Sequence, residues 1–229
     1  MSRDRETNEN EAGRHALALA GVAAVAAAAF GRLALAAAHR ETANVDDALR
    51  RRTRAPRGHP ARDAAEAASP AGKWWTYVPA ALAASAWLLR APGERGSRSR
   101  WTGAGAVMLA GAVATALNPT FDVVLPQPPA PPGHRSRNKP VFPSGHAFGP
   151  GAVAFTAAYV ATREGIARPG TAAAAAAAVP LATAGGRVLV EKHWASDVLG
   201  GYLAALSLAA ACAALYEVVR EGWEEQEDA

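Results

Sequence analysis

The chain has a single cysteine, Cys212, among its 229 residues, which excludes a disulfide within the chain and a cysteine-rich zinc site. Aromatic residues are scarce, at 7% of the chain, and no tract is basic enough to indicate nucleic-acid binding. Charged residues make up 19%, the net charge is +4, and the mean hydropathy is -0.02. This composition fits either a soluble or a membrane protein, so the two classes must be distinguished by how apolar residues are distributed along the chain.

Half of the residues are apolar, and they gather in runs about as long as a bilayer requires. The runs lie at residues 15–38, 74–89, 101–117, 147–162, 170–185 and 198–218. A soluble alanine-rich helical protein is the alternative, but its helices would show a charged face at helical spacing, and most of these runs have none. The runs therefore predict an all-α fold, a six-transmembrane helical bundle, in which Arg32 faces the bundle or the lipid headgroups.

We expect three regions along the chain: a polar N-terminal tail at 1–14, a single six-helix membrane domain at 15–218, and an acidic C-terminal tail at 219–229. The first connection, 40–73, is long and charged, and its stretch NVDDALRRR predicts a short amphipathic helix at the lipid surface. The connection at 118–146 contains LPQPPAPPG, whose prolines favour extended chain.

One polar cluster, FPSGHAFG, stands just before the fourth apolar run. Pro143 and Ser144 suit the start of a helix, and Gly145 allows backbone to approach a ligand closely. The stretch can therefore direct free N–H groups, the Ser144 hydroxyl and the positive end of the helix dipole at an anion. His146 would lie beside the bound group.

A second cluster, GRVLVEKHWASDVLGG, joins the fifth run to the sixth. His193 and Asp197 are four residues apart, so on a helix the carboxylate can accept a hydrogen bond from one ring nitrogen and leave the other as a nucleophile or base. Arg187 can offer a fork of donors to phosphate oxygens. Two membrane crossings separate this cluster from His146, so both clusters are expected at the same membrane face.

Together these residues predict phosphoryl transfer through a phosphohistidine. His193 would attack phosphorus, and His146 would protonate the leaving oxygen and then activate water. We expect no metal and no cofactor, because the chain has no HExxH or similar pair of ligands and Arg187 would repel a cation. His134 is interpreted as a solvated loop histidine.

With these residues, the chain resembles the type 2 phosphatidic acid phosphatase family, which is related to bacterial acid phosphatases and vanadium haloperoxidases. The family is recognised by the motifs KxxxxxxRP, PSGH and SRxxxxxHxxxD. PSGH is complete here, at Pro143 to His146, and GRVLVEKHWASD keeps Arg187, His193 and Asp197 at the family spacing, with Gly186 where serine is usual. The resemblance implies a six-helix lipid phosphate phosphatase, with Ser144, Gly145 and Arg187 binding phosphate.

The first family motif is degenerate. Its expected place reads NPTFDVVLP, with Asn118 in place of lysine and Leu125 in place of arginine, and only Pro126 fits. In the family those two cations bind the phosphate, so their loss weakens charge stabilisation. Downstream, HRSRNKP offers Arg135, Arg137 and Lys139 as substitutes; the alternative is a charged surface loop.

Four functions stay open at this stage, and one of them is a soluble secreted acid phosphatase of the resembling family. The leading hypothesis is a membrane phosphatase that acts on a lipid phosphate or polyprenyl diphosphate, in a bacterial plasma membrane with its site on the outer face, although counting arginines does not fix the orientation. The missing cations favour a catalytically impaired protein that binds phospholipid or acts as a scaffold. A vanadate-dependent haloperoxidase-like enzyme is the third. Membrane lipid is an expected partner, nucleic acid is not, and the sequence does not indicate an oligomeric state.

Overall fold

The structure is a computed structural model that describes residues 2–91, 97–134 and 136–227, with side chains described from residue 13 to residue 222 apart from 92–97 and 135. Helices account for all of its regular structure within these ranges. The elements are α1 (Ser2–Ala38), α2 (Ala43–Thr53), α3 (Pro60–Ala68), the short 3-10 helix η1 (Ser69–Gly72), α4 (Trp74–Arg90), α5 (Ser97–Val124), α6 (Gly145–Arg163), α7 (Pro169–Leu189) and α8 (Ala195–Glu227).

Each predicted apolar run forms a helix, in α1 and α4 through α8, which confirms the all-α prediction. Four of these helices are long and apolar enough to cross a membrane, rather than the expected six, and they are Gly13–Ala38, Arg98–Val124, Pro169–Leu189 and Ala195–Gly222. The other two, α4 and α6, are the shortest of the six, with 17 and 19 residues.

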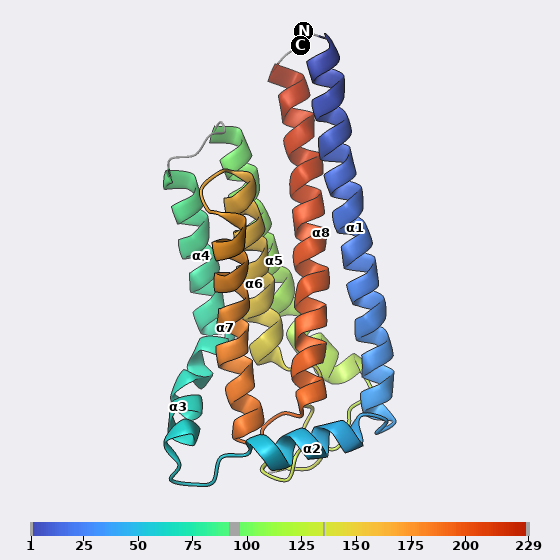
Figure 1. Cartoon of the computed structure of the whole chain (residues 1–229), viewed down its shortest axis with the longest axis vertical. Helices are drawn as coiled ribbons and strands as arrows, with labels where there is room; N and C mark the ends of the chain where they lie inside the picture. The colour runs from blue at the N-terminus through green and yellow to red at the C-terminus, as the bar shows by residue number, and fades with distance from the viewer. Residues whose placement is uncertain (1, 92–96, 135, 228–229) are drawn as a thin grey trace.

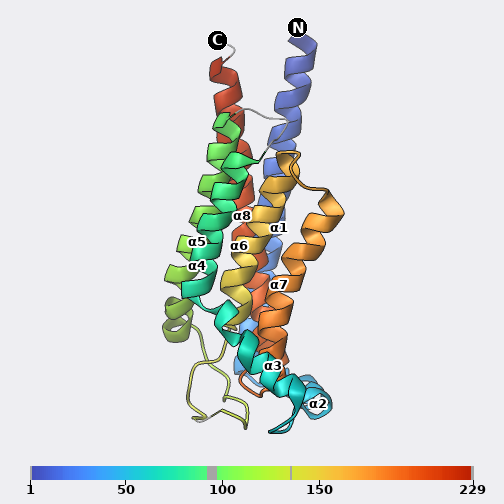
Figure 2. The ribbon, with the colours of Figure 1, turned by 90° about the vertical axis from the view of Figure 1, so that its left-hand side faces the viewer.

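The helices are arranged so that one end of the bundle collects several connections. α1 and α8 form a long pair beside the group α4 to α7, and both chain termini lie at the far end (Figure 1). α2 crosses the opposite end, where α3 and the connection 125–144 also lie (Figure 2). The amino ends of α6 and α8 and the carboxyl end of α7 therefore meet at this end, which is called the loop end below.

Two helix boundaries near the loop end differ from the prediction, and α1 and α8 also extend into the stretches that were expected to be tails. α5 continues through Pro119 to Val124, although a connection was expected from residue 118. Phe121 explains the continuation, because its ring packs 5.5 Å from Phe30 and 5.3 Å from Phe148, centroid to centroid, and this packing outweighs the hydrogen bond lost at the proline. α7 extends to Leu189, so Arg187 lies in its last helical turn rather than in a connection.

The first connection is more structured than predicted. The amphipathic helix expected there is confirmed as α2, but α3 and η1 also form. The start of α3 has a recognisable signal, because Pro60 occupies its first turn and the ring of His59 accepts a hydrogen bond of 3.2 Å from the Ala61 N–H. α3 and η1 pack against α7, and η1 also packs against α6.

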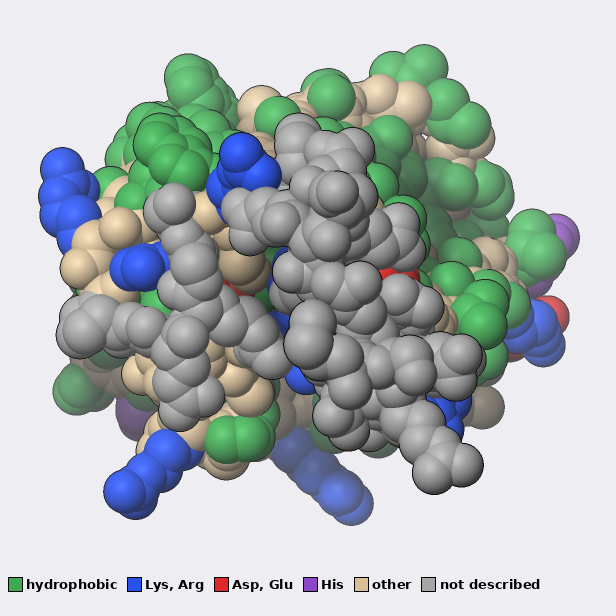
Figure 3. Space-filling model, turned by 90° about the horizontal axis from the view of Figure 1, so that it is seen from above, with side chains coloured by type: hydrophobic (Ala, Val, Ile, Leu, Met, Phe, Trp, Pro, Cys, Tyr) green, Lys and Arg blue, Asp and Glu red, His purple; other side chains and the backbone are tan. Residues whose placement is uncertain are grey.

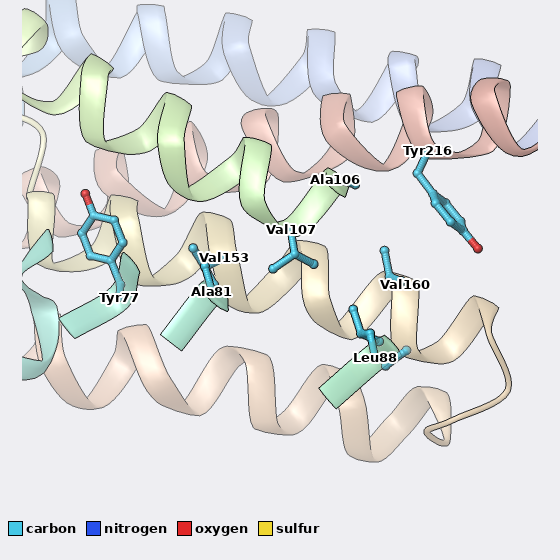
Figure 4. Close-up of a cluster of buried hydrophobic side chains, with 9 residues drawn as sticks. Tyr77, Ala81, Leu88, Ala106, Val107, Val153, Val160 and Tyr216 are labelled. Atoms are coloured by element: carbon cyan, nitrogen blue, oxygen red, sulfur yellow. The ribbon is translucent and has the colours of Figure 1, made fainter. Parts of the chain in front are cut away.

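α6 lies at the centre of the bundle and is buried along most of its length. A cluster between α4, α5, α6 and α8 forms much of the core, with Tyr77, Leu88, Val107, Val160 and Tyr216 as its large side chains (Figure 4). Small residues allow α6 and α8 to approach each other: a Cβ on Gly201 would come within 2.5 Å of the Ser144 carbonyl oxygen. This contact fixes the start of α6 against the start of α8.

Many apolar side chains point outward instead of into the core. Seen from the end that carries the termini, green hydrophobic side chains surround much of the rim, and Lys and Arg side chains project among them (Figure 3). Leu17, Val25, Trp101 and Leu181 are among the exposed large hydrophobic residues. An apolar exterior of this kind suits contact with lipid tails.

Candidate active site

The loop end brings the two predicted histidines together. His146 is in the first turn of α6, and His193 lies in the short connection between α7 and α8. Their ring centroids are 6.2 Å apart, with the ring planes inclined by 59°. At this distance both imidazoles can contact the same phosphoryl group.

His193 is oriented mainly by a backbone carbonyl. Its Nδ1 lies 2.9 Å from the carbonyl oxygen of Val141 and 3.5 Å from Oδ2 of Asp197. The predicted contact with Asp197 is therefore present at ion-pair distance, but the two residues do not share a helix face, because α8 begins at Ala195. Since both neighbours of Nδ1 are acceptors, the ring proton belongs on Nδ1, and Nε2 carries the lone pair.

Asp197 has a structural task besides its contact with His193. Its fully buried carboxylate accepts a hydrogen bond of 2.7 Å from the Trp194 N–H, which caps the start of α8. The Asp197 carbonyl accepts a further bond of 2.9 Å from the Ser144 N–H. Asp197 thus ties the His193 connection to the PSGH segment.

Gln127 was missed by the sequence analysis and holds the chain that carries Val141. Its side-chain oxygen accepts hydrogen bonds from the N–H groups of Val141 and Phe142, at 3.0 and 2.9 Å, and its amide nitrogen donates to the Phe142 carbonyl at 2.7 Å. The Trp194 indole also donates to the Pro129 carbonyl, at 2.8 Å. The proline-rich connection is therefore held at Val141, which contacts His193, and at Pro129, which contacts the neighbouring Trp194.

His146 is largely buried and surrounded by cations. Its Nε2 lies 3.2 Å from the Ser69 hydroxyl oxygen, and its carbonyl accepts a bond of 2.9 Å from the Thr183 hydroxyl. Burial, followed by the charges of Arg187, His193 and Lys73, lowers the pKa of His146 to about 3. His146 is therefore neutral in the empty site at neutral pH.

The donors predicted to bind phosphate have unused capacity. Among the described residues, the fully buried Ser144 hydroxyl and the buried Nε of Arg187 have no hydrogen-bond partner. Arg187 uses Nη1 to donate to the Ser69 hydroxyl, at 2.9 Å. The N–H groups of Gly145 and His146 begin α6 without a partner within the helix, whereas those of Ala147 and Phe148 donate to the Ser144 carbonyl. Buried donors without partners are costly, and the oxygens of a phosphate are suitable acceptors for them.

The two departures from the first family motif have different surroundings. Asn118 lies at the site, since a Cβ on Gly145 would come within 2.6 Å of its side-chain nitrogen. Leu125 instead packs with Phe142 and Ala34 in a small apolar cluster. Position 125 therefore contributes to packing, whereas position 118 presents an uncharged amide next to the start of α6.

The three proposed substitute cations are not equivalent. Lys139 is exposed, yet its charge acts on both Lys73 and His134, whose pKa values it helps to lower after the larger effect of burial. The side chain of Arg137 is exposed and its carbonyl accepts a hydrogen bond from the Ala130 N–H. Arg135 lies outside the described residues. Of the three, Lys139 has the described link to the site.

His134 does not fit the prediction of a solvated loop histidine. It is half-buried, and burial together with the charges of Lys192 and Lys139 lowers its pKa. His193 and Arg187 contribute smaller effects of the same sign, so His134 belongs to the basic surroundings of the site. Within the described part of the chain, His, Cys, Asp and Glu side chains form no group of three that could hold a metal ion.

Comparison with known proteins identifies the family. A sequence model described as the PAP2 superfamily matches residues 100–221, which is more than half of the chain. The chain belongs to the PAP2 superfamily. The matched range runs from α5 into α8 and contains His146, Arg187 and His193. A comparison with curated proteins finds no match.

The fold of this PAP2 protein also matches a solved structure, a transmembrane PAP2 type phosphatidylglycerolphosphate phosphatase from Bacillus subtilis. The two are 20% identical, with a TM-score of 0.65, and the match covers 89% of this chain and 96% of the other. At this identity the match shows the fold alone. The serine that is usual at position 186 in the resembling motif would be crowded here, because a Cβ on Gly186 would lie 3.0 Å from the Ala65 Cβ in α3.

Proposed function

We propose that this PAP2 protein is a membrane phosphatase that hydrolyses a lipid phosphate or polyprenyl diphosphate through a phosphohistidine at His193. The observation that carries the proposal is the close pair of His146 and His193, with ring centroids 6.2 Å apart, together with the unpartnered donors of Ser144 and Arg187. Such a set provides a nucleophile, a proton donor and anion binding in one place.

In the first step, Nε2 of His193 attacks phosphorus and the bond from phosphorus to the lipid oxygen breaks. The Val141 carbonyl and Asp197 stabilise the positive charge that develops on the His193 ring. His146 gives a proton to the leaving oxygen, so the lipid alcohol or lipid monophosphate departs neutral at that oxygen. Arg187, Ser144 and the N–H groups of α6 stabilise the charge on the remaining phosphate oxygens.

In the second step, a water molecule attacks the phosphohistidine. His146, now neutral, accepts the proton of that water, and the bond between phosphorus and His193 breaks to release inorganic phosphate. His146 carries the proton again, and loses it as the phosphate departs. The cycle needs the two histidines in reciprocal roles and consumes one water molecule.

The low pKa of His146 is compatible with this role because it describes the empty site. Arg187, His193 and Lys73 lower that pKa through their positive charges. A phosphate dianion among these cations opposes their field, which raises the pKa of His146 and favours uptake of a proton when substrate binds. The acid for the first step is therefore generated by the substrate itself.

We further propose that α4 and α6 cross the bilayer with the four longer helices, which gives six spans and a site at the outer face of a bacterial plasma membrane. Trp74 and Trp75 are exposed at one end of α4, and Trp87 is exposed near the other, about 20 Å along the helix axis. Exposed tryptophans at both ends of a helix favour positions at the two membrane interfaces.

The test is phosphate release by the purified chain in mixed micelles, with phosphatidate, phosphatidylglycerolphosphate and a polyprenyl diphosphate as substrates. We expect turnover on at least one of them and a fall of about three orders of magnitude in His193→Ala. His39→Ala, an exposed histidine at the end of α1, is the matched control and should retain activity. Hydrolysis that survives in His193→Ala would refute the mechanism.

A second candidate function is phospholipid binding without turnover. It is favoured by Asn118 and by Leu125, whose side chain packs in an apolar cluster instead of supplying a cation. Under this alternative the wild-type chain would bind a lipid phosphate in the same assay without releasing phosphate. The haloperoxidase alternative is tested by an assay with vanadate, peroxide and halide, because only a haloperoxidase would oxidise the halide.

A further inference from the structure

The connection between α1 and α4 contributes side chains to the site from outside the family-matched residues 100–221. Ser69, the first residue of η1, lies between two groups of the proposed machinery. Its hydroxyl accepts a hydrogen bond of 2.9 Å from Nη1 of Arg187 and lies 3.2 Å from Nε2 of His146. Since the hydroxyl accepts from Arg187, its own proton is available for His146 Nε2.

The backbone of η1 is fitted closely to His146. A Cβ on Gly72 would come within 2.4 Å of Cδ2 of the His146 ring, so only glycine permits this approach. α3 is in turn packed against Gly186, next to Arg187. The η1 segment therefore packs directly against the His146 ring, with no room for a side chain at position 72.

Lys73 directly follows η1 and adds a positive charge to the same group. Burial, and then the charges of Arg187 and Lys139, lowers its pKa. The charge of Lys73 in turn acts on His146. Its Nζ lies 5.8 Å from the centroid of the exposed Trp75 ring, at the start of α4. The ammonium group therefore lies near the exposed Trp75 ring, and its charge reaches His146.

We propose that the η1 segment is part of the phosphate site, with Lys73 binding the substrate phosphate and Ser69 positioning Arg187 and His146. The repulsion among Lys73, Arg187 and Lys139 in the empty site is relieved when an anion binds, which makes the cluster a phosphate receptor. Lys73 supplies a cation in a chain that has Asn118 and Leu125 where the resembling family has lysine and arginine. The inference rests on the proposed phosphatase function.

Lys73 is tested by binding of orthovanadate, which needs no turnover, to the purified full chain by calorimetry. We expect Lys73→Met to weaken binding by about tenfold to a hundredfold, the range for loss of a charge-assisted hydrogen bond. Lys73→Arg should retain most of the affinity. Arg57→Met removes an exposed cation of the same connection and should leave affinity unchanged. Equal affinity in wild type and Lys73→Met would overturn the assignment.

Ser69 is tested as a positioning residue by the pH dependence of kcat. The charge of Lys73 lowers the pKa of His146, and the Ser69 hydroxyl, whose proton faces Nε2, stabilises the neutral ring. Because His146 acts as an acid when protonated, Ser69→Ala and Lys73→Met should both move the loss of activity to higher pH, since each removes a group that favours the neutral ring. Ser69→Thr should restore the wild-type profile, and Ser136→Ala is the control for an exposed serine. Unshifted profiles in both variants would contradict the proposal.

The outcomes separate this inference from the proposed function. If the wild type releases phosphate, His193→Ala is inactive and Lys73→Met and Ser69→Ala behave as wild type, the phosphatase stands and the role of the η1 segment is wrong. If His193→Ala retains turnover, the phosphohistidine mechanism is wrong whatever the η1 variants do. If vanadate binds more weakly to Lys73→Met than to the wild type, the role of Lys73 in binding the anion is supported. This holds even if the chain binds lipid phosphate without turnover.

Discussion

Asp46 of α2 holds the start of α8, and removing its carboxylate should destabilise the site. Asp46 is buried, and its two oxygens accept hydrogen bonds from the Ser196 N–H at 2.9 Å and the Ser196 hydroxyl at 2.7 Å. Ser196 is three residues after His193. Asp46→Ala therefore leaves two buried donors without acceptors at the helix start that carries Asp197.

The magnitude follows from those two bonds. Each hydrogen bond to a charged group contributes about 1.5 to 3 kcal/mol, so the loss of two in Asp46→Ala should lower the free energy of unfolding by about 3 to 6 kcal/mol. We expect kcat to fall as well, because the connection that orients His193 loses its anchor. The assay is denaturation by SDS in mixed micelles, followed by tryptophan fluorescence, with phosphate release measured in parallel.

Two further variants make the test specific. Asp47→Ala changes the next residue of α2, which is not buried, and should cost less than about 0.5 kcal/mol. In a double-mutant cycle, Ser196→Ala should cost less in the Asp46→Ala background than in the wild type. If Asp46→Ala is no more destabilising than Asp47→Ala, the reasoning from the two bonds fails.

Three other predictions concern the site itself. Phosphate binding at pH 6.5 should be accompanied by uptake of a proton, because the pKa of His146 rises from about 3 when an anion binds. Calorimetry in buffers of different ionisation enthalpy measures this uptake, which should be absent in His146→Ala. Gly145→Ala should reduce phosphate release, since its Cβ meets the Asn118 amide at 2.6 Å, and adding Asn118→Ala should restore part of the rate. Gln127→Leu should lower kcat by about tenfold or more with little change in KM, measured by steady-state phosphate release, because three hydrogen bonds that hold Val141 and Phe142 are lost.

The meeting of His146 and His193 could be predicted from the sequence because it depends on counting crossings. Two apolar runs separate the clusters, so helices of similar length return the chain to the same face. The contact between Gly201 and Ser144 then brings the starts of α6 and α8 together. The spacing of His193 and Asp197 was less informative, since the helix starts between them and the closer partner of His193 is Val141.

The contribution of the first connection could not be predicted in the same way. Its composition indicates a charged surface segment, and Ser69 and Lys73 carry no motif of their own. Their approach to His146 depends on the packing of α3 against α7, where Ala65 meets Gly186. The extension of α5 past Pro119 also depends on tertiary packing, through the ring contacts of Phe121. The local helix propensity of a sequence does not determine tertiary contacts of this kind.

The most direct measurement of the central claim is rapid-quench trapping of the phosphoenzyme with a lipid phosphate labelled in its phosphoryl group. Acid-labile label should appear on the wild-type protein before steady state, and peptide mapping should locate it at His193. His146→Ala should form and lose this label more slowly, because it lacks both the acid of the first step and the base of the second. His193→Ala should trap no label. Label on another residue, or release of phosphate by wild type with no trapped intermediate in either background, would contradict the account.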